Sequence, residues 1–170
     1  MKLAAETRIR PARAEDALAL GALAMRSKAY WGYSAEFMEQ CRAELSYDVT
    51  MLASPRFSFR VAEMTNGTLA GFHAIEWQDN DVCELEALFV EPDCIGRGVG
   101  RQLMDDACGL AVERGVETLR LQGDPHARAF YEASGCVQVG ERASASVAGR
   151  SLPLFELRLR NRNTAEHGKR

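Results

Sequence analysis

The chain has 170 residues, of which 46% are apolar and 26% charged, and its formal net charge is −3. This length suits one domain with a hydrophobic core of its own, and we expect that domain to span residues 1–160. The weak negative charge argues against a protein that binds nucleic acid or an anionic membrane. No apolar run approaches the roughly 20 residues of a membrane-spanning helix.

Cysteine usage bears on compartment and on metal binding. Five cysteines occur, at positions 41, 83, 94, 108 and 136, and no two of them form a CxxC pair. The N-terminus has no apolar signal region, so we expect a cytoplasmic protein with reduced thiols. Without paired cysteines we expect no metal site.

The N-terminal third combines one strand with two helices. We predict a strand over residues 7–11 and a helix over 14–29, where apolar residues recur at helical spacing. Ser34 is a suitable N-cap for a second helix. Three aromatic residues lie between the helices: Tyr30, Trp31 and Tyr33. We expect them either to line a substrate cleft or to fill the space between the helices and the sheet.

Three consecutive antiparallel strands follow. Residues 57–64 form the first, Asn66-Gly67 signals a two-residue hairpin turn, and residues 68–77 form the second. The third runs over residues 83–90, where alternation predicts two distinct faces. One face carries Leu85, Ala87 and Phe89, and the other carries Glu84, Glu86 and Leu88.

A glycine-rich loop, Ile95-Gly96-Arg97-Gly98-Val99-Gly100, follows the third strand and leads into a helix from about residue 98. Glycines let main-chain N–H groups converge at a helix start, where the helix dipole also favours anions. The loop therefore indicates a phosphate or pyrophosphate site. A tight turn in which the glycines serve geometry alone fits the loop equally well.

Two widespread phosphate-binding motifs do not match this loop. A P-loop requires Gly-Lys-Ser/Thr, which is missing. A dinucleotide-binding fingerprint requires GxGxxG, but the spacing here is GxGxG and Arg101 follows it. No acidic residue stands where a ribose would need one.

The C-terminal part adds a strand over residues 117–122, which should lie parallel to 83–90 because a helix separates the two. Asp124-Pro125 marks another helix start, and Gly135 marks its end. We predict a final strand pair over 136–141 and 152–160. The polar residues 161–170 should form a disordered tail.

Two stretches resemble the GNAT superfamily of N-acetyltransferases. The glycine-rich loop resembles its acyl-CoA-binding motif, Arg/Gln-x-x-Gly-x-Gly/Ala: Gly98 and Gly100 match, and Ile95 stands where Arg or Gln is usual. Residues 124–135 resemble the second signature, Asn-x-x-Ala-x-x-Phe-Tyr-x-x-x-Gly-Phe. Its matching residues are Ala127, Phe130, Tyr131 and Gly135, while Asp124 replaces Asn and Cys136 replaces Phe.

The resemblance implies an α+β fold of three layers. A mixed, mostly antiparallel twisted sheet of about six or seven strands would have its central parallel pair splayed apart at a β-bulge, with about four helices around it. The pantetheine arm of acetyl-CoA would fill the gap like an added strand, and its pyrophosphate would meet the loop amides. The implied cofactor contacts are Leu88, Phe89, Val90, Ile95, Gly96, Arg97, Gly98, Val99, Gly100, Arg101, Asp124 and Phe130.

The resemblance also implies acetyl transfer from acetyl-CoA to a primary amine by direct attack in a ternary complex. The acceptor ammonium must first lose a proton, for which Glu84 is the first candidate base and Glu86 the second. Tyr131 matches the residue that protonates the leaving thiolate. A main-chain N–H of Leu88 or Phe89 would meet the oxyanion.

Acceptor specificity in this family lies in two regions, which correspond here to residues 28–37 and 142–153. The candidate acceptor contacts are Tyr30, Trp31, Tyr33 and Arg150, and they favour a small amine or an amino-acid derivative. Arg142 and Arg150 suggest either a site for a substrate carboxylate or phosphate, or ordinary surface charge. Homodimers are frequent in the family. The alternative to an enzyme is a non-catalytic acyl-CoA-binding sensor or interaction module.

Overall fold

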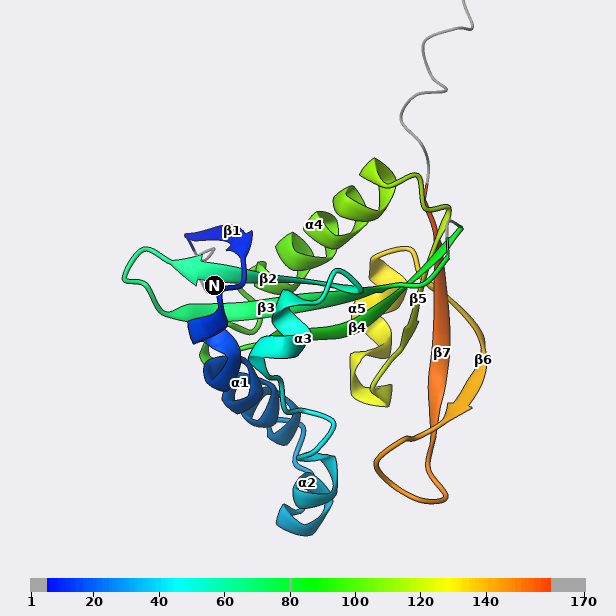
Figure 1. Cartoon of the computed structure of the whole chain (residues 1–170). Helices are drawn as coiled ribbons and strands as arrows, with labels where there is room; N and C mark the ends of the chain where they lie inside the picture. The colour runs from blue at the N-terminus through cyan, green and yellow to red at the C-terminus, as the bar shows by residue number, and fades with distance from the viewer. Residues whose placement is uncertain (1–5, 80, 160–170) are drawn as a thin grey trace, which may run out of the picture.

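The computed structural model describes residues 6–79 and 81–159 and contains one seven-stranded sheet with the order β1-β2-β3-β4-β5-β7-β6 (Figure 1). The strands are β1 (Thr7–Pro11), β2 (Phe57–Met64), β3 (Leu69–Trp77), β4 (Val82–Val90), β5 (Thr118–Gln122), β6 (Val137–Ala143) and β7 (Ser151–Arg158). The α-helices are α1 (Ala17–Ala29), α2 (Ala35–Cys41), α3 (Val49–Ala53), α4 (Val99–Glu113) and α5 (Arg128–Ala133). The predicted tail, 161–170, lies outside the described residues. The expected three-layer α+β fold is confirmed.

Helices cover both faces of the sheet, and each face has its own hydrophobic core. On one face α4 and α5 pack against the centre of the sheet, with Met104, Ala107 and Tyr131 among the buried residues. On the other face α1 contributes Leu20 and Leu23, which pack against β2, β3 and β4. The sheet is therefore the middle layer, and any site that opens between its strands is shielded on both sides.

The parallel pair β4 and β5 separates partway along its length. Pairing runs from Val82 with Thr118 to Glu84 with Arg120 and then ends, although β4 continues to Val90. Because no strand pairs with this half of β4 on that side, its main-chain groups are left facing a gap. The splayed central pair that the sequence predicted is present.

A β-bulge in β4 changes which side chains face each core. Ala74 pairs with Ala87 and Ile75 pairs with Leu85, so Glu86 has no partner on β3. Since the side-chain direction has a period of two, the extra residue reverses the alternation beyond it. Leu85 packs on the α4 and α5 side and Ala87 on the α1 side. The prediction that both share one face was therefore wrong.

Two local predictions also differ from the structure. The β2–β3 turn is a three-residue loop rather than a two-residue one, because Met64 N donates to Thr68 O at 2.8 Å and Gly67 N to Met64 O at 2.9 Å. Gly67 takes a φ of 85°, the left-handed conformation that closes such a loop. Helix α3 was not predicted, since its five residues are too few to show a helical period. Ser34 caps α2 as expected, accepting from Phe37 N at 3.1 Å.

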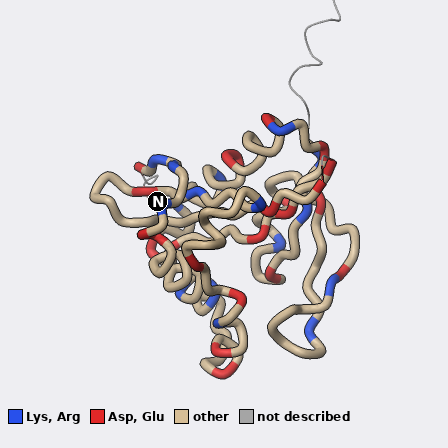
Figure 2. Tube along the Cα trace, viewed as in Figure 1, with Lys and Arg blue, Asp and Glu red and all other residues tan. Residues whose placement is uncertain are grey.

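Charged side chains of both signs are interspersed along the chain (Figure 2). This matches the small net charge of −3. Among the described helices, none has both the length and the apolar character needed to cross a bilayer.

Candidate active site

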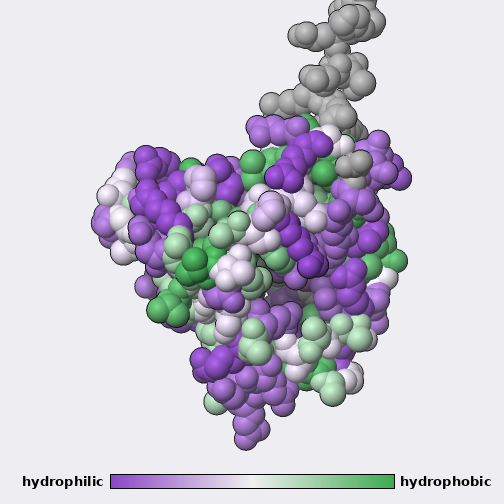
Figure 3. All heavy atoms as spheres, in the orientation of Figure 1, coloured by the Kyte–Doolittle hydropathy of each residue, from purple (hydrophilic) through white to green (hydrophobic). Residues whose placement is uncertain are grey.

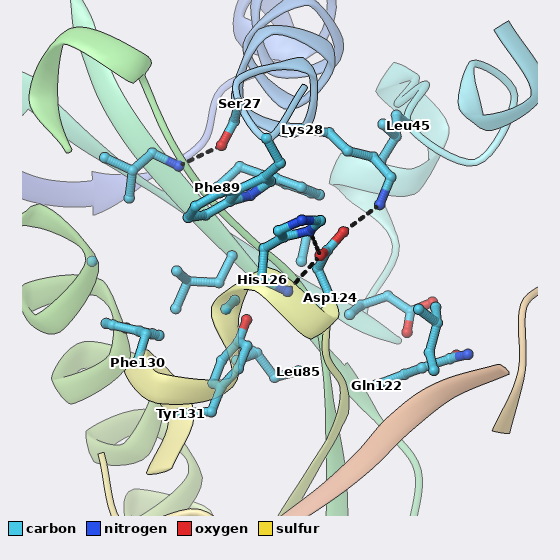
Figure 4. A pocket seen from close by; sticks show the side chains of 18 of the residues that line it. Ser27, Lys28, Leu45, Leu85, Phe89, Gln122, Asp124, His126, Phe130 and Tyr131 are labelled. Atoms are coloured by element: carbon cyan, nitrogen blue, oxygen red, sulfur yellow. Dashed lines mark hydrogen bonds and ion pairs between the residues drawn. The ribbon is translucent and has the colours of Figure 1, made fainter. Parts of the chain in front are cut away.

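A cavity of about 470 Å³ opens where β4 and β5 separate. Its walls come from residues 84–90 of β4, the glycine-rich loop, the end of α1, the start of α5 and the β6–β7 loop. Figure 3 shows a recess on this face of the molecule, and Figure 4 shows the side chains that surround the cavity. The two regions predicted to bind cofactor and acceptor therefore meet in one place.

The glycine-rich loop has the backbone that an anion site requires. Gly96 and Gly98 have φ values of 77° and 86°, which side-chain-bearing residues rarely adopt. Gly98 is the N-cap of α4, so the unpaired N–H groups of the first turn lie beside the loop. A Cβ on Gly100 would lie 3.2 Å from the ring of Phe130, so glycine is also needed for this close contact. The loop thus fits a pyrophosphate group.

Most of the predicted cofactor contacts line the cavity. They are Leu88, Phe89, Val90, Ile95, Gly96, Gly98, Gly100, Arg101, Asp124 and Phe130. Val99 differs, because its side chain is 1% exposed and packs in the core. Arg97 does not line the cavity. At Val99 a ligand can therefore contact the main chain but not the side chain.

The main-chain donors of β4 alternate between its neighbour β3 and the gap. Glu91 N donates to Ala70 O of β3 at 2.8 Å. Because donors alternate along a strand, Phe89 N–H also faces β3, whereas Leu88 and Val90 face the gap. Val90 N already donates to Ser27 Oγ at 3.3 Å. Of the two predicted oxyanion donors, the geometry therefore favours Leu88 and not Phe89.

Tyr131 extends from α5 toward the cavity, and its hydroxyl points into the cavity (Figure 4). Its side chain is buried against the rings of Phe130 and Phe155. Within residues 6–79 and 81–159 its hydroxyl makes no hydrogen bond. Burial raises the pKa of Tyr131 above its ordinary value, so the phenol stays protonated near neutral pH. This is the state that a proton donor needs.

The two candidate bases have different surroundings. Glu84 is buried and accepts hydrogen bonds from Arg142 Nη1 at 2.5 Å and from Gln78 Nε2 at 3.2 Å. Glu86, the bulged residue, lines the cavity and has no hydrogen bond or ion pair in the part of the chain that the structure describes. The free carboxylate is therefore Glu86, the second candidate from sequence.

The pKa of Glu86 is raised above the ordinary carboxyl value. The main cause is loss of hydration to the surrounding protein, and repulsion by three nearby carboxylates adds to it: Glu76, Glu84 and Glu44. A carboxylate with a raised pKa holds a proton more strongly than an ordinary one. Glu86 as a whole residue is exposed, and the bulge places its carboxylate at the point where the strands part.

Asp124 is held by groups from the acceptor side of the cavity. It accepts hydrogen bonds from Lys28 Nζ at 3.2 Å, from Tyr33 Oη at 2.8 Å, and from His126 N at 2.9 Å (Figure 4 shows the bond to His126). Tyr33 Oη in turn accepts from Arg150 Nη2 at 2.7 Å. The contact between Asp124 and the cofactor, which the resemblance implied, would have to compete with these donors.

The three predicted aromatic residues do not form one continuous wall of the cavity. Trp31 lines the cavity and stacks on His126 with ring centroids 5.5 Å apart. Tyr33 stacks on Phe37 and reaches the cavity residues through its hydroxyl. Tyr30 is 53% exposed and only packs edge-on against Trp31, so the structure does not place it in the cavity wall.

Several cavity residues were not singled out from the sequence: Ser27, Lys28, Glu44, Tyr47 and His126. Lys28 is at the edge of the specificity region, and His126 lies inside the second signature, so position alone could have indicated both. Glu44 and Tyr47 belong to the segment between α2 and α3, where the sequence shows no period. Among the described residues, no three potential metal ligands come together as a metal site.

Comparisons with known proteins agree with the geometry. A sequence model of the acetyltransferase (GNAT) family matches residues 24–136. An uncharacterized N-acetyltransferase from Methanocaldococcus jannaschii is 31% identical over 100 residues. The match covers 55% of this chain and 44% of that relative, so the chain spans less than half of the relative's length.

Solved structures show the same architecture. A GCN5-related N-acetyltransferase from Rhodopseudomonas palustris is 25% identical, with a TM-score of 0.74 over 94% of this chain and 99% of that chain. The PaiA N-acetyltransferase from Thermoplasma acidophilum, solved in complex with coenzyme A, is 21% identical with a TM-score of 0.72, over 90% and 99% of the two chains. Because the family model spans well over half of the sequence, the chain belongs to the acetyltransferase (GNAT) family.

Proposed function

We propose that the protein binds acetyl-CoA in the gap between β4 and β5 and transfers its acetyl group to a primary amine. The observation that carries this proposal is the end of β4–β5 pairing at Glu84 and Arg120, beside a glycine loop at a helix N-terminus. The gap provides unpaired main-chain groups of β4 for an extended amide-bearing arm, and the loop provides donors for phosphate. Acetyl-CoA supplies the acyl group as a thioester.

The residues around the gap have the properties that direct transfer needs. Glu86 accepts the proton of the acceptor ammonium, directly or through water, and frees the nitrogen lone pair for attack. The N–H of Leu88 stabilises the negative charge that develops on the carbonyl oxygen. The C–N bond forms first, and the nitrogen then loses its second proton to water. The C–S bond breaks as the hydroxyl of Tyr131 gives its proton to the leaving sulfur, and Tyr131 regains a proton from water. No covalent intermediate on the protein is needed.

The cysteines support transfer without an acyl-enzyme. Cys94 lines the cavity, but its side chain is buried and burial raises the pKa of its thiol. Cys83 is fully buried, and burial raises the pKa of its thiol to about 11. A thiol that stays protonated is a poor nucleophile. A ternary complex of enzyme, acetyl-CoA and amine is therefore the favoured arrangement.

Two measurements on the purified chain test the proposal. Calorimetry with CoA should detect binding at one site, and thiol release from acetyl-CoA should depend on an added amine. Arg158→Gln, an exposed change on β7 away from the cavity, serves as the matched control and should behave as the wild type. Binding without amine-dependent thiol release would favour the non-catalytic acyl-CoA-binding module, and no binding of CoA would refute both.

A further inference from the structure

Arg150 is held at the cavity wall with most of its donors unused. It precedes β7, lines the cavity, and its side chain is 19% exposed. The guanidinium lies over the rings of Phe37 and Tyr33, 4.8 and 5.2 Å from their centroids. Apart from the bond to Tyr33 Oη and a 3.8 Å approach to Asp124, it makes no polar contact with any other described residue. A guanidinium has five N–H donors, so several remain for a ligand.

A chain of hydrogen bonds fixes the position of this guanidinium. Burial and the neighbouring Asp124 raise the pKa of Tyr33 to about 12, so its hydroxyl stays protonated. It therefore donates to Asp124 while it accepts from Arg150. Lys28 Nζ and His126 N also donate hydrogen bonds to Asp124. An asparagine in place of Asp124 could not balance the charge of Lys28 or of Arg150.

Both cations and carboxylates face this part of the cavity. Asp124 contacts Lys28 at 3.2 Å and Arg150 at 3.8 Å, and Glu44 accepts a hydrogen bond from Ser146 in the loop that carries Arg150. Glu86 forms no ion pair with any described cation, while Glu84 is paired with Arg142. An acceptor that carries both an ammonium and an anionic group could pair with Glu86 and with Arg150. A diamine would place a second cation against Lys28 and Arg150.

We propose that the acceptor amine carries a carboxylate or a similar planar or tetrahedral anion, which Arg150 binds, and that Tyr33 and Asp124 are positioning residues for Arg150. This rests on the proposed function and narrows its acceptor class. A bidentate bond from guanidinium to carboxylate would fix the distance between the anion and Glu86. The acceptor ammonium would then be presented to the gap in one orientation.

Matched acceptors test the proposal through kcat and KM. The panel is the twenty common amino acids, the carboxamide and the decarboxylated amine of each, and simple diamines, with thiol release from acetyl-CoA as readout. We expect the best free amino acid to exceed its carboxamide about 10- to 100-fold in kcat/KM, the range of a charge-assisted hydrogen bond. Its aminophosphonate analogue shows whether the anion is carboxylate or phosphonate. Preference for carboxamides or diamines would overturn the proposal and leave the acetyltransferase proposal intact.

Variants assign the effect to Arg150. Arg150→Gln should raise the KM for the amino acid about 10- to 100-fold and should raise the KM for the carboxamide much less. Arg150→Lys should recover part of the preference. Tyr33→Phe should lower the carboxylate-to-carboxamide ratio in the same direction, because it removes the hydrogen bond that Arg150 donates. Equal loss for both acceptors would indicate a purely structural role and overturn the proposal.

A binding measurement keeps the proposal testable if no acceptor is turned over. Calorimetry of the CoA-loaded protein with N-acetylglycine and with N-acetylglycinamide needs no chemistry. We expect the acid to bind at least about 10-fold more tightly, and Arg150→Gln to remove the difference. Equal binding of the two probes to the wild type would refute the role of Arg150. Failure of CoA itself to bind would instead refute the proposed function.

Discussion

Replacing Tyr131 with phenylalanine removes a single oxygen atom from the cavity wall. That oxygen has no hydrogen-bond partner in the described part of the chain, and the ring keeps its contacts with Phe130 and Phe155. No buried donor or acceptor is orphaned, so we expect the free energy of unfolding to change by less than about 0.5 kcal/mol. The variant is therefore a test of chemistry and not of folding.

The expected kinetic effect follows from the loss of a general acid. Without the phenol, the sulfur must leave as a thiolate or take its proton from water, and kcat should fall about 10²- to 10⁴-fold. This corresponds to about 2.7–5.4 kcal/mol of transition-state stabilisation. The affinity for CoA should stay the same, because the ring is unchanged and the proposed mechanism brings the hydroxyl into contact with the reacting sulfur alone.

The assay combines thiol release under saturating acetyl-CoA with calorimetry of CoA binding and a urea unfolding curve. Arg158→Gln is the matched control. Wild-type turnover by Tyr131→Phe would remove this residue from the mechanism. A large loss of CoA affinity or of stability would show that the hydroxyl has a structural partner and would contradict the reasoning from its environment.

Three further changes test separate parts of the account. Gly98→Val should weaken CoA binding, measured by calorimetry, because a β-branched residue resists the φ of 86° at the start of α4; unchanged affinity would count against the loop as the pyrophosphate site. Glu86→Gln should lower kcat/KM and abolish its rise with pH, since the base acts only above its raised pKa; a retained acidic limb would point to Glu84. Asp106→Asn should cost about 1–3 kcal/mol near neutral pH, because the variant loses the charge that pairs with Arg60 and His73. Burial raises the pKa of Asp106, but these partners outweigh it and lower the pKa, so the cost should fade below about pH 4 in acid unfolding curves.

The order of strands and helices could be predicted from the sequence because each element has a period or a punctuating residue. Ser34, Gly98 and Gly135 mark helix ends by local chemistry alone, and they do so in the structure. The parallel direction of β5 followed from the helix that precedes it. Helix α3 lacked any such signal.

The bulge at Glu86 could not be predicted from the residues of β4. It depends on the register of β4 against β3. That register is set when the two strands pair, and the residues of β4 alone do not determine it. The resemblance placed Glu84 ahead of Glu86 by its position in the strand, whereas in the structure Arg142 from β6 donates a hydrogen bond to Glu84. A contact with a residue on a distant strand depends on the tertiary structure, so the spacing of the two glutamates cannot predict it.

The acceptor side shows the same limit. Four residues on separate segments are brought together only by the fold: Lys28 on α1, Tyr33 in the α1–α2 loop, Asp124 between β5 and α5, and Arg150 in the β6–β7 loop. The sequence indicated that regions 28–37 and 142–153 face the acceptor. It could not indicate that Asp124, which we expected near the cofactor, would contact residues of both regions.

A crystal structure with bound acetyl-CoA tests the central claim most directly. We predict that the pantetheine arm lies between β4 and β5, that the thioester carbonyl oxygen accepts a hydrogen bond from Leu88 N–H, and that the pyrophosphate lies at Gly96–Gly100. The acetyl carbon should then face Glu86 and the sulfur should face Tyr131. A structure in which β4 and β5 stay paired beyond Glu84, or in which the nucleotide binds elsewhere, would contradict the account.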